Sequence, residues 1–244
     1  MAYLLEHGFT RGQAGRTLFL RKIGKQLLIA QIYIDDIVFG ATLDSLSYGF
    51  ANEMKYEFEM SMIGELNFIL GIQVKQTNEG IFISQSKYAK DFVKKFGMEG
   101  KTHARTPMST SIKIRTNPTG KNIDPTLYRN MIGSLLYITA SRPDITFSVG
   151  VCARFHANPK ESHLTAVKRI LKYLSATVDY GIWYSKDSNL TLVGYSDADW
   201  VESANDRKST SGCRFYIGGN LVVWMSKKQN SISLSTAEAE YIAK

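Results

Sequence analysis

Two adjacent carboxylates, Asp35 and Asp36, interrupt the most apolar stretch in the first part of the chain. The flanking residues 27–34 and 37–40 are rich in β-branched and aromatic side chains, which favours two strands joined by a tight turn. Adjacent carboxylates repel each other, and a divalent cation relieves that repulsion. Metal ions held in pairs by carboxylates catalyse phosphoryl transfer. The two acids therefore indicate either a metal site at the tip of a hairpin or an ordinary solvated turn.

A second group of acids lies near the C-terminal end of the sequence. Asp197 and Asp199 are two residues apart on a predicted strand and share a face, so spacing alone does not separate them. Ser235 and Glu238 have the S-x-x-E spacing of a capping box at the start of a helix. Capping would give Glu238 a local role at the start of this helix, which also carries Glu240. Each of these acids could also be simply solvated.

The basic residues concentrate in the middle of the sequence. Residues 101–188 hold 13 Lys and Arg against 5 Asp and Glu, and this excess of +8 equals the net charge of the whole chain. Lys168, Arg169 and Lys172 lie on one side of a predicted helix, opposite an apolar arc. Lys and Arg contact phosphates without reading sequence. The pattern fits a polyanion-binding surface or, alternatively, a solvated basic face.

Composition excludes several classes of protein. The chain has 244 residues, 44% of them hydrophobic, which can supply an ordinary core. No apolar run approaches the roughly 18 residues of a membrane span, and the N-terminal residues do not resemble a signal peptide. Two cysteines without metal-type spacing exclude a disulfide scaffold and a zinc finger, and fit a reducing compartment.

Hydrophobic periodicity and turn residues predict a mixed succession of strands and helices. A short strand at 17–20 and a turn at Gly24 come first. The strand at 27–34 is nearly continuous in apolar residues and is expected to be buried on both faces. The other predicted elements are a helix at 44–56, a strand at 68–74 with its return strand at 81–84, helices at 87–96, 128–140 and 144–156, a helix starting at Asn158-Pro159, a strand at 190–197, a hairpin at 213–225 and a helix from Ser235.

The residues around the first acid pair resemble a known enzyme family. Tyr33-Ile34-Asp35-Asp36 matches the Y-x-D-D signature of reverse transcriptases, and residues 31–42 resemble the copia-type retrotransposon polymerases of plants. The resemblance covers essentially the whole chain in family order, through residues 65–74, 133–137, 141–145, 163 with 168–174, 194–200, 207–212 and 234–241. The chain therefore resembles part of a copia-type LTR retrotransposon Pol polyprotein.

The resemblance implies an α+β fold in which parts of two domains follow one another. Residues 1–98 resemble the C-terminal palm of a reverse transcriptase, with the Y-x-D-D hairpin and a primer-grip-like hairpin. A linker at 99–126 leads to a basic helical thumb at 127–187. Residues 188–244 resemble the N-terminal part of an RNase H-like domain, a truncated α/β sheet with its first helix.

The same resemblance assigns roles to the candidate residues. Asp35, Asp36, Asp197 and Glu240 would be catalytic and bind Mg²⁺ or Mn²⁺. Tyr33 would lie beneath the primer end, although a core tyrosine is the alternative. Lys168, Arg169 and Lys172 would contact an RNA–DNA hybrid or a template–primer duplex. His156 and His163 are expected only to pack or cap.

The implied function of the complete protein is to copy RNA into DNA and to degrade the RNA of the hybrid. The third palm carboxylate of the family would precede Met1, and the later RNase H acids would follow Lys244, so we expect this chain alone to be inactive. It would be a fragment or a decayed copy; a non-catalytic duplex-binding module is the alternative. Its partners would be nucleic acid and the remainder of the polyprotein, in the cytoplasm or nucleus and away from membranes.

Overall fold

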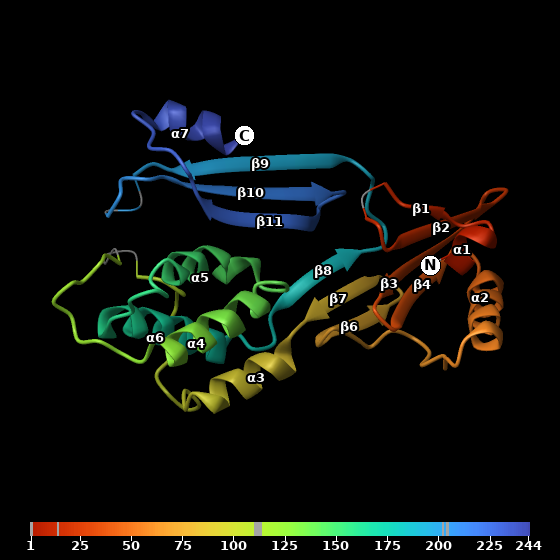
Figure 1. The fold of residues 1–244 in the computed structure, drawn as a ribbon, viewed down its shortest axis with the longest axis horizontal. Coiled ribbons are helices and arrows are strands. Elements are labelled where there is room, and N and C mark those ends of the chain that lie inside the picture. Colours follow the sequence, from red (N-terminus) through yellow and green to blue (C-terminus); the bar gives the residue numbers. More distant parts are fainter. Residues whose placement is uncertain (1, 14, 110–113, 202, 204) are drawn as a thin grey trace. The chain divides into compact units, whose positions relative to one another are not determined.

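The computed structural model describes residues 2–13, 15–109, 114–201, 203 and 205–244. The fold is mixed α and β, with antiparallel sheets, and this confirms the predicted α+β class (Figure 1). The chain divides into two compact units, Met1–Leu66 and Asn67–Lys244. Each unit has its own sheet and its own buried cluster, so they are described separately.

The first unit is a four-stranded antiparallel sheet with two helices. Its strand order is β1-β2-β3-β4, and the buried core contains Phe19, Leu28, Phe50 and Met54. The helix predicted at 44–56 is present as α2. The elements are α1 (Ala2–Glu6), β1 (Thr10–Arg11), β2 (Leu18–Ile23), β3 (Gln26–Tyr33), β4 (Asp36–Ala41) and α2 (Asp44–Glu57).

Strand β3 is buried on one face only, so the prediction of burial on both faces is wrong. Leu28 and Ala30 are fully buried, whereas Ile29 between them is 38% exposed. The core residues of α1 and α2 pack against these alternate positions of β3. Because successive side chains of a strand point to opposite faces, the other half of the apolar run is left uncovered.

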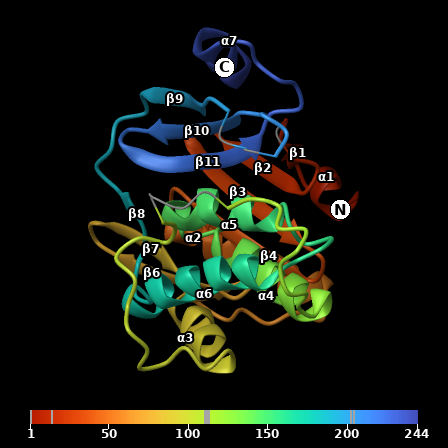
Figure 2. The same ribbon diagram turned by 90° about the vertical axis from the view of Figure 1, so that its left-hand side faces the viewer.

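The second unit begins with a sheet and a group of packed helices. Figure 2 shows α4, α5 and α6 side by side, and their contacts with α3 complete a cluster of buried apolar side chains that includes Tyr128, Leu135 and Leu171. The elements are β5 (Phe68–Ile69), β6 (Ile72–Thr77), β7 (Gly80–Ser84), α3 (Ser86–Lys95), α4 (Pro125–Ile138), the 3₁₀ helix η1 (Pro143–Ile145), α5 (Thr146–Ala153), α6 (Glu161–Ala176) and β8 (Gly181–Ser185).

The strand predicted at 68–74 is in fact two short antiparallel strands. The chain turns at Leu70 and Gly71, both with positive φ (50° and 77°), and Ile69 pairs with Ile72. The hydroxyl of Tyr137 on α4 donates to the carbonyl of Leu70. A Cβ at Gly71 would collide with that hydroxyl, so the turn needs glycine there. A contact 67 residues away in sequence thus fixes a turn that local periodicity does not indicate.

Helix α6 begins later than predicted, at Glu161 rather than at Pro159. Lys160 is the N-cap residue and has an extended backbone. An isolated β-bridge between Lys160 and Asn122 holds it there, together with a hydrogen bond from the Glu161 amide to the Lys121 carbonyl at 3.0 Å. The cap-plus-proline arrangement occurs instead at α4, where the Asp124 carboxylate accepts from the Thr126 amide at 2.8 Å.

The boundaries of two further helices differ from the predicted ones. The helix predicted at 144–156 is a 3₁₀ turn, η1, followed by the short α5, which ends at Ala153. Helix α3 ends at Lys95, one residue before the predicted end, and Gly97 stops it as predicted: the Gly97 amide bonds the Lys94 carbonyl while the Met98 amide bonds the Val93 carbonyl. These two bonds form a Schellman motif, with the glycine at positive φ.

Strand β8 was not predicted from the sequence. It pairs antiparallel with β7, with Ile83 opposite Ile182, and so joins the region predicted as thumb to the hairpin predicted as primer grip. The contacts also separate the chain at residue 66, not at the predicted domain boundaries of 98, 126 and 187. Those boundaries remain predictions.

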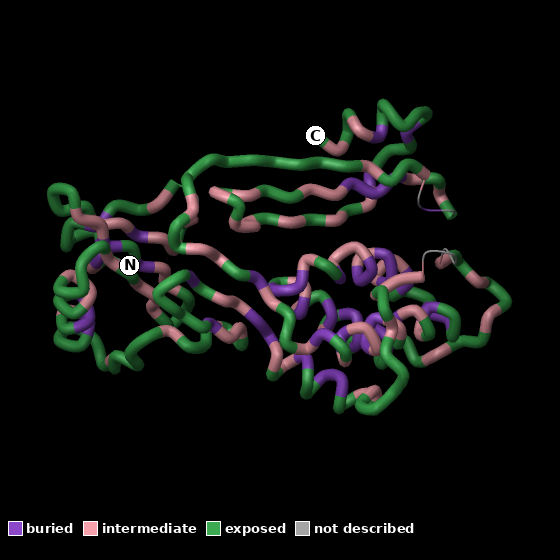
Figure 3. The backbone as a smooth tube through the Cα atoms, turned by 180° about the vertical axis from the view of Figure 1, so that it is seen from behind, coloured by how far each residue is buried: buried purple, intermediate pink, exposed green. Residues whose placement is uncertain are grey.

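The last part of the second unit is a three-stranded antiparallel sheet with a helix. Strands β9 (Leu192–Asp199), β10 (Thr210–Ile217) and β11 (Asn220–Lys228) are arranged in the order β11-β10-β9, and α7 (Thr236–Ala243) contacts β9 and β10. The predicted hairpin is confirmed, with a two-residue turn at Gly218 and Gly219, both at positive φ. Figure 3 shows that the buried residues concentrate in the helices, whereas this sheet is largely exposed.

Candidate nucleic-acid and metal-binding sites

The first acid pair lies at the β3–β4 hairpin, one residue out of the predicted register. Tyr33 pairs with Asp36, so the two-residue turn consists of Ile34 and Asp35, and Asp36 already belongs to β4. Ile34 has a φ of 55° and is 84% exposed. The prediction that both carboxylates form the tip is therefore correct for Asp35 and wrong for Asp36, because the strand pairing extends up to Asp36.

The hairpin presents its polar residues to solvent. Asp35 and Asp36 are both exposed, and Tyr33 is 47% exposed and lies outside the buried cluster of its unit, which argues against a core role. Tyr33 and Asp36 are opposite each other, so their side chains lie on the same face of the sheet. Two exposed carboxylates of adjacent residues can hold a hydrated divalent cation weakly.

Asp197 and Glu240 come from different elements that the fold brings together. Glu240 on α7 accepts a hydrogen bond from the amide of Ala198, next to Asp197, at 3.2 Å. Strand β9 is at the edge of its sheet, which leaves that amide available to a side chain. Glu238 accepts instead from the Leu234 amide at 2.7 Å, and the Glu238 amide donates to Ser235 Oγ at 3.2 Å, so Glu238 has the predicted capping role.

A small cavity of about 390 Å³ lies beside β9 within the second unit. Asp197 and Asp199 both line it, together with Arg214 and Trp224 of the same sheet and Phe147 of α5. The two aspartates occupy alternate positions of β9 and so share the face that lines the cavity. The structure therefore does not distinguish Asp197 from Asp199 as the metal-binding residue, just as their spacing in the sequence does not.

Neither acid pair forms a full metal cluster within the described part of the chain. No group of three or more His, Cys, Asp or Glu side chains there is arranged to hold a metal ion. The carboxylates suit Mg²⁺ or Mn²⁺ by their oxygen ligands. Two carboxylates in each acid pair are enough to hold one metal ion weakly.

The three basic residues predicted on one face of α6 line the larger cavity of the second unit, of about 1020 Å³. Lys168 is exposed, and Arg169 and Lys172 are half-buried. Arg169 is partly engaged by its own chain, because Nε donates to the carbonyl of Thr106 at 3.1 Å and Nη2 to the hydroxyl of Thr106 at 3.0 Å. Lys168 and Lys172 are the cations of this helix that remain in reach of a ligand in the cavity.

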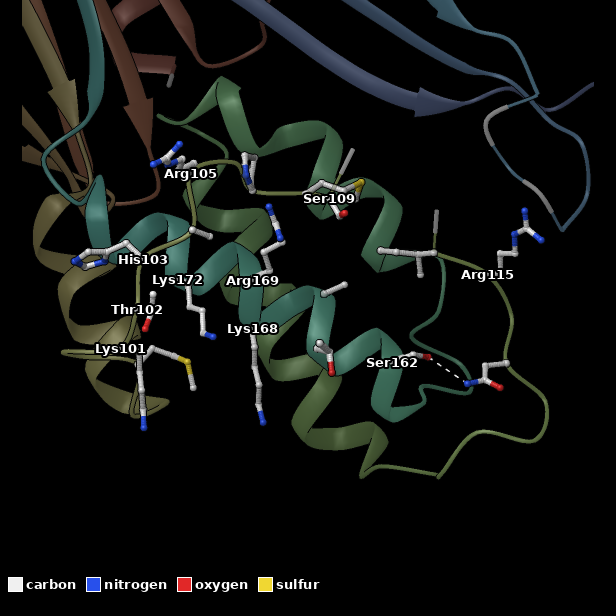
Figure 4. A pocket seen from close by; sticks show the side chains of 18 of the residues that line it. Lys101, Thr102, His103, Arg105, Ser109, Arg115, Ser162, Lys168, Arg169 and Lys172 are labelled. Atoms are coloured by element: carbon white, nitrogen blue, oxygen red, sulfur yellow. Dashed lines mark hydrogen bonds between the residues drawn. The ribbon is translucent and has the colours of Figure 1, made fainter. Parts of the chain in front are cut away.

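The other wall of this cavity comes from the segment predicted as a linker. Figure 4 shows Lys101 and His103 toward one end and Arg115 toward the other, with the α6 cations between them. Lys101, Arg105 and Arg115 are lining residues that sequence reasoning did not single out. All three belong to the excess of basic residues in 101–188, and that excess is the sequence signal that could have identified them.

His163 and His156 have the structural roles expected of them. His163 is 1% exposed, its Nδ1 accepts from the Lys160 amide at 3.0 Å, and its Nε2 donates to the Arg115 carbonyl at 2.9 Å. It also stacks on Phe155 with ring centroids 4.1 Å apart. His156 bonds the Ala153 carbonyl through Nδ1 at 2.7 Å. His163 thereby ties the start of α6 to the segment that forms the opposite cavity wall.

Cys152 offers no nucleophile to a reaction site. Cys152 and Cys213 are both free. Burial raises the pKa of the Cys152 thiol to about 12, so the thiol stays protonated and unreactive at neutral pH.

Among the residues that the structure describes, no helix is long and apolar enough to span a membrane.

Comparison with known proteins places the chain in a family. Residues 1–110 match the family model described as reverse transcriptase (RNA-dependent DNA polymerase). The chain is 36% identical over 239 residues to the retrovirus-related Pol polyprotein from transposon RE1 of Arabidopsis thaliana, and 34% identical over 239 residues to that from transposon RE2. Both matches cover 98% of this chain and 16% of the polyprotein, so the chain spans about a sixth of their length.

A shorter relative matches along most of both chains. The mitochondrial protein AtMg00810 of Arabidopsis thaliana, which carries the description uncharacterized, is 34% identical over 216 residues, covering 87% of this chain and 88% of its own length. No solved structure matches significantly. On these similarities, the chain belongs to the reverse transcriptase family of copia-type retrotransposon Pol polyproteins.

Proposed function

We propose that this chain is the part of a retrotransposon polymerase in which the end of the reverse transcriptase palm, a basic thumb and the first elements of an RNase H domain follow one another. The observation that carries the proposal is the β3–β4 hairpin, which presents Tyr33, Asp35 and Asp36 to solvent within the segment that matches the reverse transcriptase model. In the complete polyprotein the function is to copy RNA into DNA and to cleave the RNA of the resulting hybrid.

Each acid pair contributes part of a divalent-metal site to that chemistry. Asp35 and Asp36 offer exposed oxygens at the hairpin, and Asp197 and Glu240 offer oxygens at the edge of β9. Divalent ions bound there would stabilise the charge that develops in phosphoryl transfer. Two carboxylates supply too few ligands to fix two ions roughly 4 Å apart. The chain on its own is therefore expected to bind Mg²⁺ weakly and to lack both activities.

The cavity along α6 favours a second candidate function, a nucleic-acid-binding module without chemistry. Its lining includes six Lys and Arg side chains, and no Asp or Glu is found among the described residues that line it. Such a lining attracts phosphates independently of sequence. Binding by this chain would then persist although catalysis does not.

The proposal is tested by magnesium-dependent assays on the purified chain. We expect neither extension of a labelled primer on an RNA template nor cleavage of an RNA–DNA hybrid. Mn²⁺ titration followed by paramagnetic line broadening is expected to show weak binding, which Asp36→Asn and Asp197→Asn each reduce at their own site. Asp187→Asn is the matched control, since Asp187 is exposed and outside both acid pairs.

Two results would contradict the proposal. Primer extension or hybrid cleavage that Asp36→Asn or Asp197→Asn abolishes would show that the chain alone is catalytically competent. Mn²⁺ broadening that is unaffected by both substitutions, or equally affected by Asp187→Asn, would show that the two acid pairs are ordinary solvated carboxylates.

A further inference from the structure

The cavity along α6 has cations on two opposing walls, and this arrangement points beyond a duplex-binding helix face. One wall is α6, with Lys168 and Lys172; the other is the segment after α3, with Lys101, Arg105 and Arg115. In Figure 4 these side chains are spread along the length of the cavity and not gathered at one point. A ligand that neutralises them must carry several negative charges along its length and must fit between the walls.

The segment that forms the second wall is fixed to α6 by direct contacts. Arg169 binds both the carbonyl and the hydroxyl of Thr106, and His163 binds the carbonyl of Arg115. His103 Nδ1 lies 3.0 Å from the hydroxyl of Ser175, near the C-terminal end of the helix. These contacts hold the two walls in place at both ends, so the space between them is a built feature of the fold.

The size of the cavity selects among nucleic acids. Its volume of about 1020 Å³ is at the upper end of the roughly 300–1,000 Å³ range of pockets that enclose small ligands. A few nucleotides of an extended strand fit this space. A duplex does not, because its two phosphate backbones are held apart by stacked base pairs and could contact only the exposed rim near Lys168.

We propose that the cavity between α6 and the described residues of 101–109 and 114–117 binds a short stretch of single-stranded nucleic acid through its phosphates. The inference deepens the proposed nucleic-acid function and rests on it, but it names a single strand where that function names a hybrid or duplex. No Phe, Tyr or Trp is found among the described residues that line the cavity. With no such ring among them for a base to stack on, we expect binding to depend mainly on the backbone and to be tolerant of base identity.

The charge of the lining supports a ligand site over a structural role. Six Lys and Arg side chains share one cavity with no described acid to pair with them there. Like charges that line one cavity oppose folding through self-repulsion. A change of Lys101 or Lys168 to Glu relieves this repulsion, so it is expected to leave the melting temperature unchanged or higher while it weakens binding.

The experiment compares a fluorescein-labelled 12-nucleotide single strand with the same strand in an RNA–DNA hybrid, by anisotropy at 100 mM salt. The full chain is expected to bind the single strand about tenfold more tightly than the hybrid. Lys101→Glu and Lys168→Glu each weaken single-strand binding about tenfold. Lys101→Arg keeps the charge and restores affinity, and Lys186→Glu, at an exposed lysine outside the cavity, leaves it unchanged.

Base identity gives a second readout. Single strands of uridine and of adenosine are expected to bind with affinities within about threefold of each other, because phosphates carry the contact. Hybrid binding that equals or exceeds single-strand binding overturns the inference and leaves the proposed function intact. Single-strand binding unaffected by Lys101→Glu overturns it as well. Absence of binding to either probe overturns the inference, whereas the metal-titration and activity assays above judge the proposed function separately.

Discussion

The helices α3–α6 and the C-terminal sheet with α7 belong to the same compact unit but are held together in different ways. The helices share a cluster of fourteen buried residues, almost all apolar, such as Leu135, Ile170 and Leu171. Among the described residues of 188–244, Ala239 is the one buried hydrophobic side chain. The cavity with the cations is thus built on the well-packed helices, and the acids Asp197 and Glu240 are carried by a sheet with little apolar core.

Buried polar side chains take the place of a core in the C-terminal part. Gln229 is 5% exposed, and its Nε2 donates to Ser211 Oγ at 3.0 Å and to the carbonyl of Ala239 on α7 at 2.9 Å. Its Oε1 accepts from Ser233 Oγ at 3.1 Å. Hydrogen bonds of this kind contribute only about 1 kcal/mol each to stability. Such an arrangement orients α7, and with it Glu240, but stabilises the fold less than apolar packing does.

The largest predicted effect is the loss of packing in the helices. Leu171→Ala removes a side chain that is 0% exposed and is expected to lower the free energy of unfolding by about 2–5 kcal/mol, from lost burial and the cavity left behind. Val223→Ala on β11, where the side chain is 49% exposed, is the matched control and is expected to cost within about 0.5 kcal/mol. Urea unfolding followed by circular dichroism measures both. Equal costs would contradict the difference between the two regions.

The next effect concerns an ion pair of the helices in which Arg142 is buried and the Asp144 side chain is 34% exposed. Arg142 is 3% exposed; Nε and Nη2 donate to the two Asp144 oxygens at 2.9 and 2.7 Å, and Nη1 donates to the Thr177 carbonyl at 2.7 Å. Burial alone would raise the pKa of Asp144, but hydrogen bonds and the charge of Arg142 outweigh it and hold that pKa below its ordinary value. Tyr173 strengthens this by donating to the same carboxylate at 2.8 Å.

The sign of the resulting pH dependence follows from that depressed pKa. The stabilisation is complete above the unfolded-state pKa of about 3.9 and is lost as pH falls through the lower folded-state value. Asp144→Asn is expected to lower stability at pH 7 by about 1.5–3 kcal/mol, because Arg142 loses a charged partner, and to flatten the decline in acid. Urea unfolding at pH 7 and at pH 3 measures both changes.

Asp206 is the carboxylate of the C-terminal part to compare with Asp144, because it also pairs with a basic side chain. A hydrogen bond from Lys228 and another with Ser203 lower its pKa to about 2, but the pair is partly exposed. Because water screens such pairs, Asp206→Asn is expected to cost under about 1 kcal/mol. A cost for Asp206→Asn that matches or exceeds that for Asp144→Asn would contradict the claim that the helices carry the stronger interactions.

A further predicted effect is local to α7. Gln229→Ala removes the hydrogen bonds to Ser211, Ser233 and Ala239 and is expected to lower stability by about 1–2 kcal/mol. Amide hydrogen exchange is expected to show faster exchange in residues 236–243 while α3–α6 are unchanged. Gln76→Ala, on β6 and outside this network, is the control. Faster exchange spread over both regions would show that they unfold together.

Local pattern predicted the elements whose shape depends on their own sequence. The apolar arc of α6, with Val167, Ile170 and Leu174 buried, was correct. The β10–β11 hairpin turns at Gly218 and Gly219 as predicted, but Asn220, which was predicted in the turn as well, already belongs to β11. The period of 3.6 residues and the need for glycine at positive φ are properties of the segment itself. The capping role of Glu238 was predicted for the same reason.

Errors arose where a distant part of the chain decides the local structure. The turn at Leu70 depends on Tyr137, the start of α6 depends on Asn122, and the pairing of β8 depends on β7. Of the candidate site residues, the sequence singled out the two acid pairs and the α6 cations, and their roles remain predictions. It did not identify Lys101, Arg105 and Arg115, because nothing within residues 99–126 shows that this segment packs along α6.

The most direct test of the account is the salt dependence of single-strand binding by the unmodified chain. The logarithm of the association constant is expected to fall linearly with the logarithm of salt concentration, by roughly 0.7 per phosphate neutralised. With Lys101, Lys168 and Lys172 in contact, the slope is expected to be about −2 or steeper between 50 and 200 mM salt. A flat dependence, or no binding at 50 mM, would contradict the claim that the basic cavity on α6 binds nucleic acid.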